Sequence, residues 1–362
     1  MGSEANKIEV LTFLGYYLPG YRAGGPVRTL VNMVEALADK VSFHIVTSDR
    51  DFGATAPYDG VETLRWLRVG KAHVCYVHKK DQHLFNWFQI IRKTPHDVLY
   101  LNSLFDPRFS ILPLFTVNAL HATKKTVVLA PRGELSPGAV ALKNWKKRPF
   151  LWITRHLPLY RHVIWQASSA DEARLIKTHY GASAQVIVAP NLGGHVTDPV
   201  VSWSNTNSDR PLKVVFLSRI ARKKNLDFAL DALALVSSNI EFNIFGILED
   251  IHYWDLCSKK MQTLPKNVEV QYRGELVHSD VPDVLRHYDL LLFPTRGENY
   301  GHVIAEALSA GVPVLISDQT PWKELEKEGV GWDLPLSIGP QGFARLIDQQ
   351  GDIILNNRGE WR

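Results

Sequence analysis

The sequence predicts an α/β protein made of two units, each built on a doubly wound parallel sheet. The length of 362 residues suits two domains of typical size. Apolar runs of strand length alternate with amphipathic stretches of helix length. This alternation stops over residues 191–210, which are rich in Gly, Ser, Asn, Thr, Asp and Pro as a linker is, and then resumes. We therefore expect one Rossmann-like domain over residues 1–190 and a second over residues 211–362.

The first unit should contain buried parallel strands joined by helices. Its strands are expected where the sequence is almost continuously apolar: Ile8–Leu14, Ser42–Thr47, Val74–Val77, Val98–Leu101, Thr126–Ala130, His162–Gln166 and Val186–Ala189. Its helices are expected where apolar residues recur at helical spacing: Pro26–Ala38, Leu84–Lys93, Pro107–Ala122 and Ala170–Thr178.

The second unit repeats this alternation after the linker. The expected strands are Lys213–Leu217, Glu241–Phe245, Val268–Tyr272, Leu290–Phe293 and Pro313–Ile316. The expected helices are Asn225–Leu235, Glu249–Thr263, Val281–His287 and Gly301–Ala310. Open parallel sheets bind ligands at the carboxyl ends of their strands. Two such units joined by a linker predict a ligand cleft between them.

Composition limits the class of protein. Lys and Arg exceed Asp and Glu by 41 to 37, a mild excess that does not point to nucleic acid but is compatible with anionic small molecules or an anionic membrane surface. Cys75 and Cys257 are isolated, which fits a reducing, cytosolic compartment and no metal cluster. No stretch reaches the roughly 18 apolar residues of a membrane span, and the first residues are polar.

Residues Pro294–Ile316 combine a strand end, a Gly-bearing turn, a helix start and a second strand. Glu298 precedes the helix that begins beside Gly301, and Glu306 lies two turns inside it. The free N–H groups of a first helical turn attract phosphate. The pattern therefore fits a phosphate with an acid on either side, as a nucleotide sugar requires. An exposed helix with a capping Glu298 and a solvated Glu306 fits the same spacing.

A basic turn follows the first strand of the second unit. Arg219 and Lys224 in Phe216–Asn225 are placed to bracket a diphosphate, Arg through its planar fork and Lys as a point charge. Taken alone, a solvated basic turn is the simpler interpretation.

A glycine-rich loop follows the first strand of the chain. Gly24 and Gly25 precede Pro26, which gives a flexible loop before a helix that starts with proline. The loop is not the G-x-G-x-x-G dinucleotide fingerprint.

In combination, these elements identify a family. The chain resembles the retaining glycosyltransferases of family 4, which have the GT-B fold, over nearly its whole length. The resemblance rests on the Gly24-Gly25 loop, on Ser218-Arg219 with Lys224-Asn225, and on the Glu298 and Glu306 pair followed by Ala310-Gly-Val-Pro313.

The resemblance implies roles for the matching residues. Arg219 and Lys224 would hold the donor diphosphate, Glu298 would contact the transferred sugar, and Glu306 would contact the ribose hydroxyls. The other implied substrate contacts are Gly24, Gly25, Asn299, Tyr300, Gly301, His302 and Val303. Members usually retain the anomeric configuration and need no metal. No cofactor is therefore expected, and the donor would be a UDP- or GDP-sugar.

The sequence departs from the family pattern at the acceptor side. Many members carry a His-containing motif there, whereas this chain has Ala130–Leu135, so Arg132 and Glu134 are the expected acceptor-side residues. His302 would touch the donor sugar or lie on the polar face of its helix. Members usually end in a helix that crosses back onto the first domain. This chain ends at Trp361-Arg362, so that helix is expected to be short or truncated.

A metal-binding motif is matched by chance. Asp49-Arg50-Asp51 follows a strand and has the D-x-D pattern of metal-dependent glycosyltransferases. It lies in the first unit, whereas the expected donor residues lie in the second. We therefore expect no catalytic metal there.

Residues Leu142–His156 are basic and aromatic. One hypothesis places this stretch on an anionic membrane surface, with Trp145 and Trp152 at the interface. The alternative, which we favour from the sequence, is an ordinary helix of the first domain with its aromatic side chains in the core.

We therefore expect a hexosyl-type glycosyltransferase that moves a sugar from a nucleotide diphosphate to a hydroxyl of a glycan or lipid-linked acceptor. Family analogy points to bacterial surface polysaccharide or lipopolysaccharide assembly in the cytoplasm, with peripheral membrane contact left open. A nucleotide-sugar epimerase of similar fold and a non-catalytic nucleotide-sugar-binding subunit are the alternatives. Tyr272–Leu276 is expected near the nucleobase but does not distinguish uracil from guanine.

Overall fold

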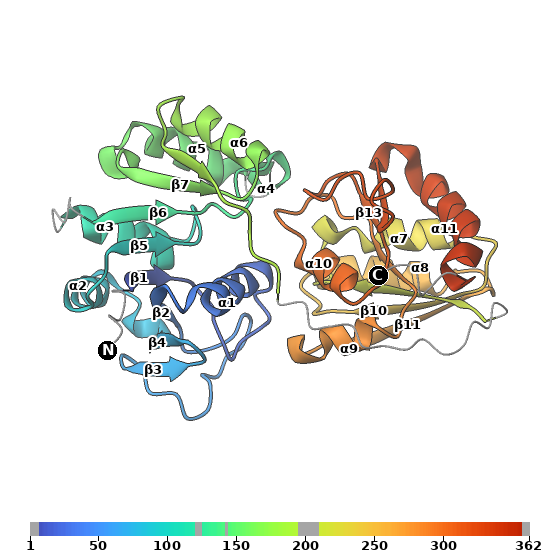
Figure 1. Ribbon diagram of the computed structural model, residues 1–362, viewed down its shortest axis with the longest axis horizontal. Coiled ribbons are helices and arrows are strands. Elements are labelled where there is room, and N and C mark those ends of the chain that lie inside the picture. Colours follow the sequence, from blue (N-terminus) through green and yellow to red (C-terminus); the bar gives the residue numbers. More distant parts are fainter. Residues whose placement is uncertain (1–6, 120–124, 142–143, 195–209, 357–362) are drawn as a thin grey trace, which may run out of the picture. The chain divides into compact units, whose positions relative to one another are not determined.

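The computed structural model describes residues 7–119, 125–141, 144–194 and 210–356 (Figure 1). The chain divides into two compact units, Met1–Leu192 and Gly193–Arg362, which are called unit 1 and unit 2. Each unit contains one sheet with helices packed against it, so the predicted α/β class is confirmed. Most of the predicted linker, residues 195–209, lies outside the described residues.

Unit 1 has an eight-stranded sheet of order β3-β4-β2-β1-β5-β6-β7-β8. Its strands are β1 Ile8–Phe13, β2 Val41–Ser48, β3 Trp66–Val69, β4 Ala72–Val77, β5 Val98–Leu101, β6 Thr126–Leu129, β7 Val163–Ala167 and β8 Val186–Val188. Its helices are α1 Gly25–Leu37, α2 Leu84–Lys93, α3 Leu112–Ala119, α4 Pro137–Ala141, α5 Asn144–His156 and α6 Ala170–Tyr180.

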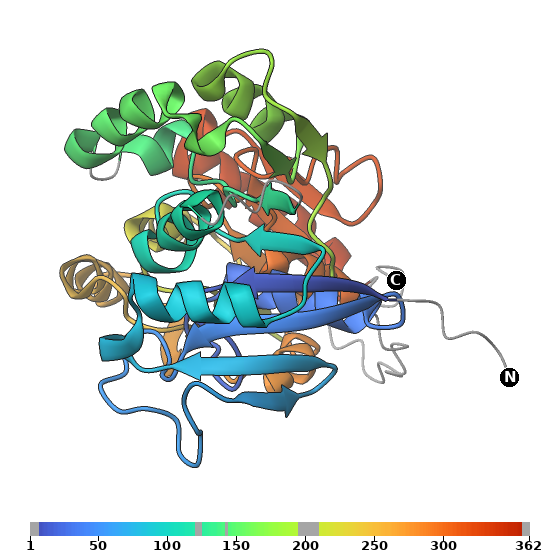
Figure 2. The same cartoon turned by 90° about the vertical axis from the view of Figure 1, so that its left-hand side faces the viewer.

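The sheet of unit 1 is covered on both faces, because alternate residues of a strand point to opposite sides. Leu11 and Phe13 of β1 belong to the core that contains Trp87 of α2. Val10 belongs to a second core, which contains Leu30 of α1. Figure 2 shows this sheet with helices packed against it. Such a doubly wound sheet leaves the carboxyl ends of its strands as the edge for ligands.

Unit 2 has a six-stranded sheet of order β11-β10-β9-β12-β13-β14, in which every pair is parallel. Its strands are β9 Leu212–Leu217, β10 Ile240–Phe245, β11 Val268–Gly274, β12 Leu290–Phe293, β13 Val314–Ser317 and β14 Gly331–Leu334. Its helices are α7 Leu226–Leu233, α8 Ile251–Met261, α9 Val281–Leu285, α10 His302–Ser309 and α11 Gly339–Asn356. The order places β9 beside β12, so the loops after these two strands are neighbours.

The structure adds elements that the sequence pattern does not predict. β3 pairs antiparallel with β4 at the edge of an otherwise parallel sheet. β14 and α11 complete unit 2. The predicted helix Pro107–Ala122 begins as a π-helical turn over Pro107–Ile111 before α3, and its end lies outside the described residues.

The favoured interpretation of residues 142–156 is wrong for the two tryptophans. Trp145 is 75% exposed and Trp152 is 70% exposed. They are seven positions apart, so they share one face of α5, whereas Leu151 and Thr154 on the opposite face are buried. None of the helices in the described parts of the chain has both the length and the apolar character that crossing a membrane requires.

Candidate active site

The loops after β9 and β12 are pinned to each other by Asn225. This residue has the left-handed conformation (φ 63°) that ends a short 3-10 turn over Arg222–Lys224. Its side-chain amide donates to the carbonyl oxygen of Pro294 at 2.8 Å and accepts from Arg296 Nε at 2.8 Å. Asn tolerates this conformation better than most side chains. The two loops are therefore held next to each other at the carboxyl ends of the strands.

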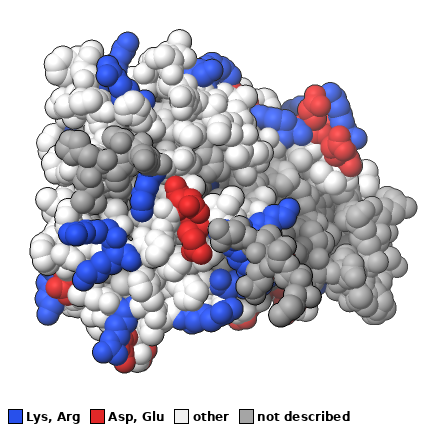
Figure 3. Space-filling model, turned by 60° about the vertical axis from the view of Figure 1, so that its left-hand side comes forward, with Lys and Arg blue, Asp and Glu red and all other residues white. Residues whose placement is uncertain are grey.

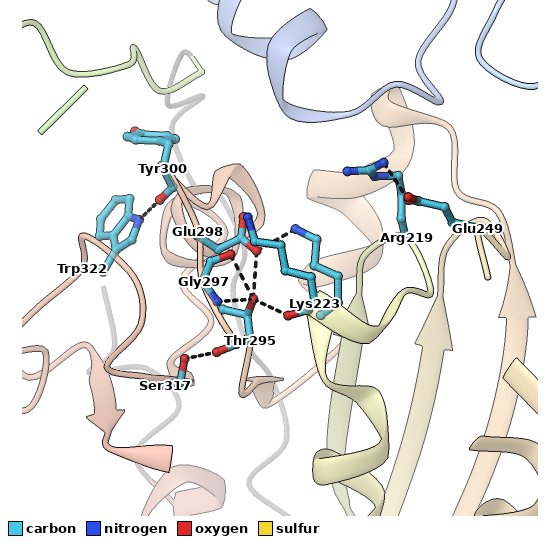
Figure 4. A network of polar contacts seen from close by, with 10 residues as sticks. Arg219, Lys223, Glu249, Thr295, Gly297, Glu298, Tyr300, Ser317 and Trp322 are labelled. Carbon is cyan, nitrogen blue, oxygen red and sulfur yellow. Dashed lines mark hydrogen bonds and ion pairs between the residues drawn. The ribbon is translucent and has the colours of Figure 1, made fainter. Parts of the chain in front are cut away.

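This arrangement of the two loops places Lys224 in contact with Glu298. Lys224 Nζ lies 2.6 Å from Glu298 Oε1, and the side chains are only 15% and 12% exposed. The hydroxyl of Thr295, which is fully buried, lies 3.0 Å from the same carboxylate oxygen. Figure 4 shows Thr295 between Glu298 and Lys223. The Thr295 hydroxyl donates to the backbone carbonyl oxygen of Lys223 at 3.1 Å. Two predicted catalytic residues are thus in direct contact.

The charge of Glu298 is set by competing effects. Burial raises the pKa of Glu298, but the adjacent Lys224 ammonium, with Lys223 and the Thr295 hydroxyl, outweighs burial and holds that pKa below its ordinary value. The carboxylate is therefore ionised at neutral pH. It can accept hydrogen bonds from hydroxyl groups, but it does not carry the proton that a general acid would need.

Arg219 lies on the loop after β9 and pairs with a residue that the sequence analysis did not select. Arg219 Nη1 lies 2.6 Å from Glu249 Oε2, with both side chains about one-third exposed. Glu249 follows β10, the strand beside β9. Figure 4 shows this pair apart from Glu298. Its position just after a predicted strand is the feature of the sequence that could have identified Glu249 as a site residue.

The loops after β9 and β10 touch at a glycine. A Cβ at Gly246 would lie 1.7 Å from the carbonyl oxygen of Ser218, and the φ of Gly246 is 145°. Ser218 N–H donates to the Phe245 carbonyl at 3.0 Å, and Ile220 N–H donates to the Ile247 carbonyl at 2.8 Å. These contacts hold Arg219 between two fixed neighbours.

The turn before α10 is shaped by Gly301 and Trp322. Gly301 has φ 81° and precedes the first helical residue, His302. Trp322 Nε1 donates to the Tyr300 carbonyl at 2.6 Å, and the Tyr300 ring lies 4.7 Å from the His302 ring. Asn299 and Val303 flank this turn. Gly301 thus starts the helix that was predicted to bind phosphate. Trp322, which the sequence analysis did not select, holds the turn before that helix in place.

Glu306 lies inside α10 and is partly buried, rather than fully turned to solvent. Its Oε1 lies 3.6 Å from His278 Nδ1, and its side chain is 20% exposed. His278 comes from the 3-10 turn before α9. The two glutamates of the predicted pair therefore have different surroundings, since Glu298 contacts a lysine and Glu306 faces a histidine.

The glycine-rich loop of unit 1 is anchored by the residues that resemble a metal motif. The Asp51 carboxylate accepts the N–H groups of Tyr21 and Arg22 at 3.0 and 3.3 Å. Asp49 is buried and accepts from Arg50 Nε at 2.8 Å. Gly24 caps α1 at φ 73°, and Gly25 is its first residue. Within the described residues, no group of three or more His, Cys, Asp or Glu is arranged to hold a metal ion.

The two expected acceptor-side residues differ in their contacts. Glu134 accepts from Ser103 Oγ at 2.8 Å and from Leu104 N–H at 2.6 Å, so it anchors the turn after β5. Burial raises the pKa of Glu134 above its ordinary value. Arg132 donates to Asn102 Oδ1 at 2.8 Å, and its buried Nε has no hydrogen-bond partner among the described residues.

Comparisons with known proteins locate the family resemblance. Residues 200–349, within unit 2, match the model of the family described as glycosyl transferases group 1. An uncharacterized 41.2 kDa protein in the cps region of Klebsiella pneumoniae is 26% identical over 259 residues, which cover 68% of each chain.

Solved structures match the fold over nearly the whole chain. Anabaena HepE, in complex with UDP and glucose, has a TM-score of 0.68 at 17% identity, covering 98% of this chain and 94% of that one. WaaG, a glycosyltransferase involved in lipopolysaccharide biosynthesis, has a TM-score of 0.65 at 15% identity, with coverages of 98% and 94%. The predicted GT-B fold is thereby confirmed. The match to the group 1 model covers residues 200–349, whereas the likeness of fold extends over both units.

Proposed function

We propose that this protein is a retaining, metal-independent glycosyltransferase that moves a hexose from a UDP- or GDP-sugar to a hydroxyl acceptor. The observation that carries the proposal is the buried contact of Lys224 with Glu298, with Arg219 on the same loop as Lys224. A cation for the diphosphate and an ionised acid for the sugar meet at the carboxyl edge of a parallel sheet, where such folds bind ligands. This edge belongs to the unit that matches the group 1 model.

The two cations would stabilise the leaving group. Breaking the bond between the sugar and the diphosphate places negative charge on the diphosphate oxygens. Lys224 and Arg219, with the N–H groups at the start of α10, would stabilise that charge. The leaving phosphate can then take the proton of the acceptor hydroxyl. The proposal therefore assigns no general base to the protein.

Glu298 and Glu306 would position the donor. The low pKa of Glu298 keeps it ionised, so it would accept hydrogen bonds from hydroxyls of the transferred sugar. Glu306 would accept from the ribose hydroxyls, and Asn299–Val303 would contact the sugar and phosphate through backbone N–H groups. Gly24, Gly25 and Arg132 of unit 1 would serve the acceptor.

The proposed setting is bacterial surface polysaccharide or lipopolysaccharide assembly, in the cytoplasm at the inner face of the membrane. Two relatives support this setting, because one lies in a cps region and the other is involved in lipopolysaccharide biosynthesis. A UDP-sugar is the first donor to test, since HepE was solved with UDP and glucose. The acceptor would be a glycan or a lipid-linked sugar.

A donor panel tests the reaction. The protein is incubated with UDP- and GDP-hexoses, with and without candidate acceptors, and release of nucleotide diphosphate and new glycosides are measured with and without EDTA. We expect one donor to be consumed at the same rate in EDTA, with the anomeric configuration kept in the product. Interconversion of free sugar nucleotides would instead indicate an epimerase. Binding without turnover of any donor would indicate a binding subunit.

A further inference from the structure

A buried threonine lies in the loop after β12. Thr295 is fully buried, and Figure 4 shows it next to Glu298, Gly297 and Lys223. Its hydroxyl oxygen lies 3.0 Å from Glu298 Oε1, 3.1 Å from the Lys223 carbonyl oxygen and 3.4 Å from the Gly297 carbonyl oxygen. A hydroxyl has one hydrogen, so it donates to one of these oxygens at a time. Of the three acceptors, the ionised carboxylate forms the strongest bond.

Other groups hold the backbone around this hydroxyl. The Lys223 carbonyl oxygen also accepts the N–H of Arg296 at 2.8 Å. The Ser317 hydroxyl donates to the carbonyl oxygen of Thr295 itself. These carbonyl oxygens therefore have hydrogen-bond donors besides the Thr295 hydroxyl, and the acceptor that distinguishes this hydroxyl is the carboxylate of Glu298.

The carboxylate of Glu298 is held at one oxygen and open at the other. Lys224 Nζ and the Thr295 hydroxyl both contact Oε1, at 2.6 and 3.0 Å. Among the described residues, Oε2 has no hydrogen-bond partner, and it is not sealed from solvent. Each oxygen of an ionised carboxylate can accept about two hydrogen bonds. Oε2 is therefore the oxygen that can accept a hydrogen bond from a ligand.

The two groups on Oε1 differ in charge and in stiffness. Charged side chains ordinarily lie at the surface, as Figure 3 shows for one face of the molecule, and a buried carboxylate needs fixed partners. Lys224 carries the neutralising charge, but its ammonium lies at the end of a flexible stem. Thr295 is β-branched and fully buried, so its hydroxyl has a restricted direction. Lys224 thus keeps Glu298 ionised, and Thr295 fixes its orientation.

We propose that Thr295 is a positioning residue for Glu298, and that it holds Oε1 so that Oε2 accepts a hydrogen bond from a hydroxyl of the transferred hexose. When the diphosphate of the sugar donor attracts the Lys224 ammonium, the Thr295 hydroxyl remains on Oε1, and the carboxylate keeps its orientation. The inference rests on the proposed function. It extends that function by naming the oxygen that meets the sugar and the residue that orients it.

An NMR titration of the full chain tests this role without a sugar donor. The carboxyl signal of Glu298 is followed against pH in protein labelled at its glutamate carboxyl carbons, and Glu298→Gln identifies that signal. The neighbouring charges, Lys224 and Lys223, stay positive over the acid range. Removing a hydrogen bond to the ionised form raises the pKa of a carboxyl group. We therefore expect a higher pKa of Glu298 in Thr295→Val, and a pKa near that of the wild type in Thr295→Ser.

Kinetics with the sugar donor that the panel identifies test the effect on the reaction. A hydrogen bond to a charged group contributes enough for Thr295→Val to lower turnover by about tenfold or more at neutral pH. Thr295→Ser should restore turnover. Because Glu298 accepts from the sugar only when ionised, the acid limb of the pH–rate profile should also move to higher pH in Thr295→Val. Thr295→Ala removes the same hydroxyl with less bulk, and it replaces Thr295→Val if valine prevents folding.

Ser317→Ala is the matched control. Ser317 is also fully buried, but its hydroxyl donates to the Thr295 carbonyl oxygen rather than to Glu298. This variant should leave the pKa of Glu298 and the acid limb unchanged. An unchanged pKa of Glu298 in the folded variants without the Thr295 hydroxyl would overturn the proposal, as would an equal rise in Ser317→Ala. If the wild type consumes no sugar donor, the proposed reaction fails, and the NMR titration still decides the role of Thr295.

Discussion

At the scale of single residues, the Lys224 and Glu298 contact is the test of the site. We expect Lys224→Ala and Glu298→Ala each to lower turnover by about a hundredfold or more, as for loss of a preorganised stabilising group. Donor consumption under saturating donor measures this effect. Lys327→Ala is the control, because Lys327 pairs with Glu324 in an exposed ion pair of the same unit. Turnover near that of the wild type in both site variants would remove these residues from the site.

Glu298 also predicts how stability depends on pH. Its folded-state pKa lies below the ordinary value of 4.5, so its contribution is fully present above that pH and is lost as pH falls through the folded pKa. The free energy of unfolding of the wild type should therefore decline below pH 4.5 more steeply than that of Glu298→Gln. Urea unfolding at pH 7 and at several lower pH values measures the difference. Parallel curves for the two proteins would contradict the assignment.

The residue types of the site could be predicted, but not their pairing. Lys224 and Glu298 stand out in the sequence because each follows a predicted strand. Their contact depends on β9 lying beside β12 and on the left-handed Asn225, and local sequence patterns determine neither. Thr295 and Glu249 were missed for the same reason, since their roles come from partners far away in the chain.

At the scale of elements, Gly246 fixes the loops that carry Arg219. Gly246→Ala would place a Cβ 1.7 Å from the Ser218 carbonyl oxygen, so the backbone must move. We expect a loss of about 3 kcal/mol in the free energy of unfolding, together with weaker nucleotide binding because Arg219 shifts. Gly329→Ala is the control, since Gly329 also has a positive φ but open space around it. It should cost about 1 kcal/mol. If the two variants lost the same free energy of unfolding, the positive φ alone, and not the close contact with Ser218, would explain the loss.

Elements with a clear apolar pattern were predicted well, and others were not. α2, β5 and β12 have the predicted bounds. α11 was missed because its sequence contains Gly339, Pro340, Gly342 and Gly351, which oppose helix formation. Packing of Phe343 and Ile347 into the core of unit 2 overrides that local preference. Local sequence patterns do not reveal tertiary contacts of this kind.

At the scale of the whole molecule, the sequence predicted the two-unit α/β organisation because the alternation of strands and helices stops and resumes. The α5 tryptophans escaped this reasoning, because a hydrophobic side chain is ordinarily assigned to the core. Trp145 and Trp152 break that rule, because both side chains are largely exposed.

The division into two units predicts where a nucleotide acts. The proposed donor residues all lie in unit 2, which has its own hydrophobic core. UDP or GDP at about 100 times its dissociation constant should add about 2.7 kcal/mol to the stability of the state that binds it. Hydrogen exchange should show new protection in the loops after β9 and β12, and it should persist in EDTA if no metal is needed. The Lys224→Ala variant should lose this protection, whereas Lys327→Ala should keep it. Protection confined to unit 1 would contradict the placement of the donor.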